Sequence, residues 1–152
     1  MQPKQMIYLD ANATMPLHPS VKDAVTVALE SNGNPSAVHQ AGRDARSIIE
    51  AARKTIADEL SVSTAQVIFT SGGTEANNLS LSAFKDNEVL VSGIEHDCIL
   101  HRFNNPVHHI KISNQGLVDL NDLENKLKAG TYKCVAVMHA INETGIIQPV
   151  KK

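Results

Sequence analysis

Residues 71–74, Ser-Gly-Gly-Thr, have the composition of an anion-binding turn. They follow residues 67–70, an uncharged β-branched and aromatic run that predicts a short buried strand. From Thr74 onward the apolar residues recur at helical spacing. A strand that ends at glycines and opens a helix leaves free backbone N–H groups at the positive end of the helix dipole. The sequence therefore predicts a site for a phosphorylated small molecule or cofactor.

The spacing of this turn argues against two common phosphate loops. It lacks the Gly-Lys-Ser/Thr ending of a nucleotide P-loop, and it lacks the G-x-G-x-x-G spacing of dinucleotide-binding folds. Short glycine motifs are weak indicators, so a plain glycine turn between a strand and a helix fits the same letters. Both interpretations stay open on this stretch alone.

The cysteines and histidines offer no clear reactive set. Cys98 and Cys134 form no C-x-x-C pair. A sulfur-accepting cysteine needs access and a lowered pKa, whereas a small cysteine that packs in the core is the commoner situation, so packing is expected for both. His108 and His109 fall on opposite faces of a predicted strand, and no tetrahedral metal set is evident. No metal site is expected.

Composition limits the classes of function. The 152 residues are 42% hydrophobic and 20% charged with a net charge of −2, which suits one globular domain or a piece of a larger one. No long run of one charge sign and no Trp are present, so nucleic-acid binding is not expected. No apolar run could span a bilayer and no signal peptide is visible, so a cytoplasmic protein without a membrane partner is expected.

Hydrophobic periodicity predicts strands that alternate with helices. The expected strands are residues 7–9, 67–70, 89–91, 108–112 and 132–138, and the expected helices begin near Ser20, Ala41, Thr74, Asp97 and Asp119. This order indicates an α/β fold with a mainly parallel sheet flanked by helices, which binds ligands beyond the carboxyl ends of its strands. Loops 71–74, 93–96 and 139–144 begin there and could converge on one pocket. An exposed Glu50–Lys54 pair is expected on the long helix.

Several groups of residues also match a family pattern in order. They are Tyr8-Leu9-Asp10-x-x-Ala13-Thr14-x-Pro16, Gly33-Asn34-Pro35-Ser36-x-x-His39, Thr70-Ser71-Gly72-Gly73-Thr74-Glu75-Ala76-Asn77-Asn78, Ile94-Glu95-His96 and Met138-His139-Ala140-x-Asn142-Glu143-x-Gly145-x-Ile147-Gln148-Pro149. Together they resemble cysteine desulfurases, pyridoxal-phosphate enzymes of the class-V aminotransferase group (fold type I). The resemblance covers the whole chain and corresponds to the N-terminal portion of such an enzyme. It implies an N-terminal strand and irregular arm in residues 1–16 and an incomplete cofactor-binding large domain in residues 17–152.

The resemblance implies a role for each loop. Thr74 and the backbone of Gly73 would hold the phosphate of pyridoxal 5'-phosphate. His96 would stack on the pyridine ring and is the candidate for proton transfer, and Asn142 would hydrogen-bond the phenolic oxygen or the bound amino acid. Spacing alone fits an ordinary loop histidine at position 96 and a turn-stabilising asparagine at position 142 equally well.

The activity that the resemblance implies is removal of sulfur from L-cysteine, which gives alanine and an enzyme persulfide for iron–sulfur cluster assembly or other sulfur transfer. In the family the Schiff-base lysine, the acidic partner of the pyridinium nitrogen and the persulfide cysteine lie beyond the matched portion. The chain alone is therefore expected to be inactive. It is expected to work as a homodimer or with a complementary C-terminal polypeptide, and to pass sulfur to an acceptor protein.

Two other interpretations stay open. One is a non-catalytic truncated remnant or interaction module of the same fold, and the other is a selenocysteine lyase or another class-V aminotransferase. The chain departs from the family pattern at Met15, Ile141 and Thr144, which bears on substrate placement. Half of a parallel sheet would also expose an edge, so self-association or a need for a partner is expected.

Overall fold

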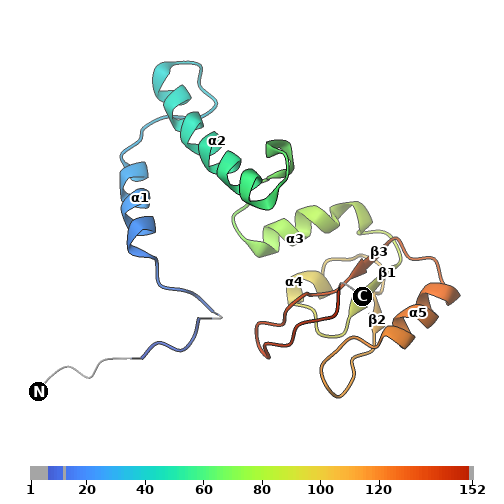
Figure 1. Cartoon of the computed structure of the whole chain (residues 1–152). Helices are drawn as coiled ribbons and strands as arrows, with labels where there is room; N and C mark the ends of the chain where they lie inside the picture. Colours follow the sequence, from blue (N-terminus) through green and yellow to red (C-terminus); the bar gives the residue numbers. More distant parts are fainter. Residues whose placement is uncertain (1–6, 12, 151–152) are drawn as a thin grey trace, which may run out of the picture. The chain divides into compact units, whose positions relative to one another are not determined.

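The computed structural model describes residues 7–11 and 13–150, which divide into two compact units between Phe69 and Thr70 (Figure 1). The first unit contains α1 (Pro19–Leu29), α2 (Gln40–Leu60) and the 3-10 helix η1 (Thr64–Gln66). The second contains α3 (Gly73–Leu81), the 3-10 helix η2 (Ser82–Phe84), β1 (Val89–Ser92), α4 (Asp97–Leu100), β2 (His108–Ile110), α5 (Leu120–Ala129) and β3 (Cys134–Ala136). Among the described residues, no helix combines the length and the apolar character that crossing a membrane requires.

The second unit is built on a parallel sheet with the strand order β2-β1-β3. In the register of the sheet, Leu90 of β1 lies opposite His108 of β2 and Val135 of β3. β1 is buried along its whole length because it is apolar and has a neighbour on each side. The described strands confirm the expected α/β fold with a parallel sheet.

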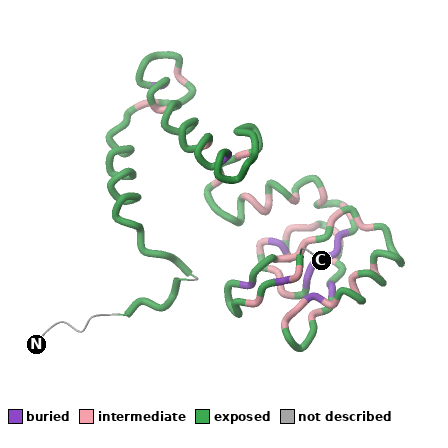
Figure 2. The backbone as a smooth tube through the Cα atoms, in the orientation of Figure 1, coloured by how far each residue is buried: buried purple, intermediate pink, exposed green. Residues whose placement is uncertain are grey.

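Helices cover both faces of this sheet, because successive side chains of β1 point to opposite faces. Val89 and Val91 pack with Ile99 of α4, and residues of α3 and η2 pack against this cluster. Leu90 packs on the other face with Ile110 and Val118, where Leu123 of α5 contacts the cluster. Figure 2 shows these buried residues concentrated in and around the strands. The core therefore lies next to the strand ends from which the candidate loops depart.

In the first unit a loop approaches α2 closely at Gly42. An added Cβ on Gly42 would lie 2.4 Å from the carbonyl oxygen of Ala37 and 2.7 Å from that of Asn34. α2 begins after His39, whose Nδ1 accepts from the Gly42 amide, and ends at Ser61 in the left-handed conformation (φ 54°). α1 buries none of its residues. Only glycine at position 42 allows the loop to pack this closely on α2.

Gly42→Ala is expected to destabilise the first unit. The methyl group would overlap two backbone oxygens and push the loop away from α2, at a cost of about 1–3 kcal/mol in unfolding free energy. Urea unfolding followed by helical circular dichroism measures this effect. Gly72→Ala is the matched control, because nothing lies within 4 Å of its added Cβ. Equal midpoints for the two variants would contradict the role given to Gly42.

Two expected strands are absent. Residues 7–9 are exposed and pair with no strand among the described residues. The Tyr8 hydroxyl lies 2.9 Å from the carbonyl oxygens of Asp10 and Thr14 and so stabilises a turn. The rest of the N-terminal arm includes residues 1–6 and 12, outside the described residues, and its boundary after Pro16 stays a prediction.

Residues 67–70, predicted as a buried strand, pair with no strand within residues 7–11 and 13–150. Ile68 exposes 67% of its surface, so the expected burial is wrong. The Arg53 guanidinium donates to the Val67 carbonyl and lies 4.9 Å from the centre of the Phe69 ring. The Arg53 side chain thus donates a hydrogen bond to the Val67 carbonyl, a group that would bond to a neighbouring strand in a sheet.

Other differences concern helix ends and ion pairs. α1 begins after His18 rather than at Ser20, because Pro19 fits the first helical position. α4 begins at Asp97, as expected, and ends at Leu100. The expected Glu50–Lys54 pair is wrong: Glu50 pairs with Arg53 at 3.2 Å, and Lys54 pairs with Asp58 at 2.7 Å.

Candidate functional site

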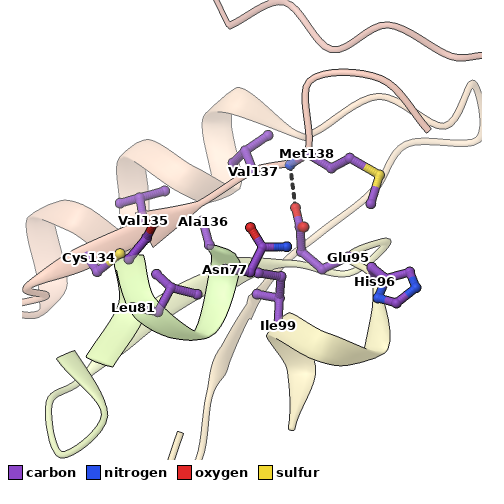
Figure 3. A pocket seen from close by; sticks show the side chains of 11 residues that line it. Asn77, Leu81, Glu95, His96, Ile99, Cys134, Val135, Ala136, Val137 and Met138 are labelled. Atoms are coloured by element: carbon purple, nitrogen blue, oxygen red, sulfur yellow. Dashed lines mark hydrogen bonds between the residues drawn. The ribbon is translucent and has the colours of Figure 1, made fainter. Parts of the chain in front are cut away.

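Two adjoining cavities lie at the carboxyl ends of β1 and β3. The first, which we call the helix cavity, has a volume of about 380 Å³ (Figure 3), and its lining residues are Asn77, Ser80, Leu81, Glu95, His96, Ile99, Cys134, Val135, Ala136, Val137 and Met138. The second, the loop cavity, has a volume of about 210 Å³, and its lining residues are Ile94, Glu95, His96, Asp97, Met138, Ile141, Asn142 and Glu143. The two cavities share Glu95, His96 and Met138. His96 and Asn142, which the sequence singles out, therefore border the same cavity.

His96 stands where the chain leaves β1 and enters α4. Its Nδ1 accepts a hydrogen bond from the Cys98 amide at 3.2 Å. A backbone amide can only donate, so Nδ1 carries the lone pair and the ring proton is on Nε2. The ring is exposed, and its orientation is fixed by the first turn of α4. It therefore presents a flat face and an N–H donor beside both cavities.

Asn142 lies at the tip of a small hairpin, residues 139–148. The Ile141 amide donates to the Ile146 carbonyl at 3.0 Å, and Gly145 (φ +74°) closes the turn in a conformation that favours glycine. Ile141 is buried, which explains why an apolar residue suits this departure from the family pattern. The hairpin holds exposed Asn142 at the rim of the loop cavity.

The base of this hairpin is fixed by the buried amide of Gln148. Its Oε1 accepts from the Val118 amide at 2.8 Å, and its Nε2 donates to the Gly116 carbonyl at 2.8 Å. The backbone amide of Gln148 donates to the His139 carbonyl at 2.7 Å. Because all three groups are satisfied, the hairpin is anchored to the segment that precedes α5.

Gly73 and Thr74 form the first turn of α3, as the sequence predicts, and line neither cavity. An added Cβ on Gly72 or Gly73 meets nothing within 4 Å beyond the neighbouring residues and the backbone of the helix itself. The next turns of α3 contribute Asn77 and Ser80 to the helix cavity. The helix that begins at the predicted phosphate turn thus lies beside the space that His96 borders.

A carboxylate supports the predicted phosphate turn. Glu75 accepts hydrogen bonds from the Ser71 hydroxyl at 2.6 Å and from the Ser71 amide at 2.7 Å. These two bonds, the hydroxyl first, lower the pKa of Glu75 below its ordinary value of 4.5. Glu75 therefore stays charged near neutral pH and fixes the segment that enters the turn.

Removing this charge by Glu75→Gln is expected to change the pH dependence of stability. Since the folded-state pKa is lowered, the contribution of the charge is fully present above pH 4.5 and is lost as the pH falls through the lower folded-state pKa. The difference in unfolding free energy between wild type and variant should therefore shrink in acid. Urea titrations from pH 7 to pH 3 measure it, and a difference that stays constant over this range would contradict the expectation.

Both cysteines are partly buried and pack against the core of the second unit. The Cys98 sulfur accepts from the Asn77 side chain at 3.3 Å and packs against the core cluster around Val89. Burial raises the pKa of Cys134, which keeps its thiol protonated at neutral pH. No group of three or more metal-ligating side chains occurs in the described part of the chain.

Sequence reasoning missed the contributions of Glu95, Asn77 and Met138 to these cavities. Glu95 and Asn77 stand inside the motifs that carry the family resemblance, so the motifs themselves were the available signal. Around the loop cavity the arrangement offers a flat imidazole with a donor on Nε2 and a primary amide on a fixed hairpin. The N-terminus of α3, which is suited to an anion, begins one turn before Asn77 of the helix cavity.

The chain is similar to several known sequences and structures. It is 36% identical to the cysteine desulfurase IscS of Dictyoglomus turgidum over 98% of this chain and 41% of that protein. It is 35% identical to human selenocysteine lyase over 97% of this chain and 40% of that protein. The crystal structure of a NifS-like protein from Rickettsia africae matches with a TM-score of 0.86 and 38% identity, over 95% of this chain and 42% of that one.

These matches confirm the expected fold, and the chain spans about two fifths of the length of the relatives it matches. The sequence model of the family described as Aminotransferase class-V matches residues 7–152, nearly the whole chain. The chain therefore belongs to the class-V aminotransferase family.

Proposed function

We propose that this chain supplies the phosphate-binding and ring-contacting part of the pyridoxal 5'-phosphate site of a cysteine desulfurase. Members of the class-V family depend on this cofactor. The observation that carries the proposal is that His96 and Asn142 border one cavity while α3, which begins at Gly73, lines the cavity beside it. The residues present fit the cofactor, because an open helix terminus suits its phosphate and an exposed imidazole suits its ring.

Each residue has a proposed task. The Gly73 amide and the Thr74 hydroxyl bind the phosphate at the positive end of α3, and His96 stacks on the pyridine ring and can give up or receive a proton at Nε2. Asn142 orients the ligand through its side-chain amide. The cofactor, when bound, supplies an electron sink for the amino-acid substrate.

For the whole protein, the proposed reaction takes sulfur from L-cysteine and leaves alanine and an enzyme persulfide, for iron–sulfur cluster assembly or other sulfur transfer. The Schiff-base lysine, the acidic partner of the pyridinium nitrogen and the persulfide cysteine are proposed to lie outside these 152 residues. Homodimerisation or a complementary polypeptide, a sulfur-acceptor protein and a cytoplasmic location belong to the same proposal.

One observation favours a second candidate, selenocysteine lyase, since the human enzyme of that name is 35% identical to this chain. The experiment that separates the candidates combines the chain with the remaining sequence of the protein or with its complementary polypeptide. Release of alanine from L-cysteine, with sulfide appearing when a thiol reductant is added to reduce the enzyme persulfide, supports the desulfurase. Turnover of selenocysteine alone supports the lyase, and turnover of neither supports a non-catalytic module of this fold.

The 152-residue chain is expected to bind pyridoxal phosphate without forming a specific covalent adduct. None of its lysines is proposed as the Schiff-base residue, so borohydride reduction should trap only scattered, substoichiometric adducts. Peptide mapping after reduction measures this. A stoichiometric adduct on one lysine would contradict the assignment.

A further inference from the structure

We propose that Glu95 is a positioning residue that sets the spacing between His96 and the Asn142 hairpin. The expected effect on pyridoxal phosphate binding rests on the proposed function. The expected effect on the Glu95 hydrogen bonds depends only on contacts within the chain. Glu95 lines both the helix cavity and the loop cavity, and it is the residue directly before His96.

The Glu95 carboxylate joins the two segments that leave the sheet. Its Oε1 accepts from the Ser92 hydroxyl at 2.7 Å and from the Met138 backbone amide (Figure 3). Ser92 is the last residue of β1 and is fully buried, and Met138 lies two residues beyond the end of β3. One oxygen atom therefore links the chain after β1 to the chain after β3.

This link replaces a bond that the sheet does not make. In the parallel register Val91 lies opposite Ala136, so continued pairing would bring Gly93 opposite Met138. The chain turns away after Ser92 instead, and the Gly93 amide donates to Ile110 on the β2 side at 3.2 Å. The side chain of Glu95 then provides the acceptor for the Met138 amide. At the carboxyl ends of β1 and β3, where the cavities lie, the hydrogen bond from the Met138 amide to Glu95 thus takes the place of a backbone bond between the two strands.

The position of this bond matters for both candidate ligand-binding residues. His96 follows Glu95, and the hairpin that carries Asn142 begins directly after Met138. A half-buried carboxylate that accepts two hydrogen bonds has a defined rotamer and resists displacement, because charge-assisted bonds are the stronger kind. If Glu95 loses these bonds, the two walls of the loop cavity are free to move apart.

The test compares Glu95→Ala with Glu95→Gln in the full 152-residue chain. Alanine removes the acceptor, whereas glutamine keeps an oxygen for the two donors. Without cofactor, the Met138 amide should exchange with solvent about tenfold faster or more in Glu95→Ala and within about threefold of wild type in Glu95→Gln. NMR hydrogen exchange measures both. Glu124→Ala is the control, since that exposed carboxylate pairs with Lys128 along α5 and its loss should leave the Met138 rate unchanged.

A second readout concerns the ligand. The dissociation constant for pyridoxal phosphate, measured by equilibrium dialysis, should rise about tenfold in Glu95→Ala and recover in Glu95→Gln. Recovery by glutamine distinguishes a positioning role, which needs an oxygen acceptor, from a requirement for negative charge. If the wild-type chain does not bind pyridoxal phosphate, the proposed function fails, and the exchange measurement still decides whether Glu95 fixes the two segments.

Several results would overturn the inference. They are an unchanged Met138 exchange rate in Glu95→Ala, equal acceleration in the alanine and glutamine variants, or faster exchange with unaltered affinity in a chain that binds the cofactor. If Glu95→Ala does not fold, Ser92→Ala replaces it, because it removes one donor and keeps the carboxylate. Met138 exchange that is faster by about two- to fivefold in Ser92→Ala supports the inference, and no change refutes it.

Discussion

Replacing Gly73 with aspartate is expected to lower the affinity for pyridoxal phosphate at least a hundredfold while leaving α3 as stable as before. The new carboxylate would stand at the first residue of the helix, where the phosphate is proposed to bind. Two unit charges about 4 Å apart near a protein surface repel by about 4 kcal/mol before salt screening, and about 2.7 kcal/mol already corresponds to a hundredfold loss of affinity. Equilibrium dialysis at fixed ionic strength measures the change.

The helix itself should tolerate this substitution. An added Cβ at position 73 meets no atom within 4 Å, and an acidic residue in the first turn stabilises a helix by about 0.3–1 kcal/mol. Gly73→Asn is the matched control, because it has nearly the same shape without the charge and should bind far better than Gly73→Asp. In Gly73→Asp the affinity for pyridoxal phosphate should therefore fall while the unfolding free energy does not, whereas a general folding defect would lower both. Equal affinities for the two variants would place the phosphate elsewhere.

Leu90→Ala is expected to destabilise the second unit by about 2–5 kcal/mol. Leu90 is fully buried at the centre of the middle strand, where it packs with Ile110 and Val118. Truncation leaves a cavity between the sheet and α5 that the parallel neighbours of β1 cannot close by moving. A loss of this size is a large part of the stability of an ordinary domain, about 5–15 kcal/mol.

Urea unfolding followed by tyrosine fluorescence and circular dichroism measures this effect. Leu127→Ala is the control, because Leu127 exposes 46% of its surface on α5 and alanine is a good helix former. A midpoint for Leu90→Ala close to that of Leu127→Ala would show that the central strand is not the core of this unit.

The helices and strands that the sequence predicts correctly are those in which the local residue pattern agrees with the burial in the fold. Residues 89–91 are a continuous apolar run, and they form most of β1, the buried middle strand. α5 begins as expected after Asp119, whose carboxylate accepts from the amides of Asn121 and Asp122. By contrast, residues 67–70 have a strong β propensity but no neighbouring strand, and a strand exists only through its partners.

The candidate site was predictable to the extent that topology determines it. Parallel strands end at one edge of a sheet, so the loops with His96 and Asn142 were expected to meet, and they line one cavity. The convergence of the Thr74 turn with them stays a prediction. The hydrogen bond between Glu95 and Met138 could not be predicted, because it joins residues 43 positions apart. Its donor is a backbone amide, which almost every residue type has, so the identity of residue 138 does not indicate the bond.

The buried Gln148 side chain also bears on how this region can evolve. It holds the root of the Asn142 hairpin through contacts that do not involve the tip. Insertions, deletions or replacements near Glu143 and Thr144 can therefore accumulate without straining the neighbouring strands, as is usual for loops on a rigid scaffold. Relatives of this chain could diverge in what they recognise by remodelling a few residues at that tip, while the scaffold that supports it stays the same.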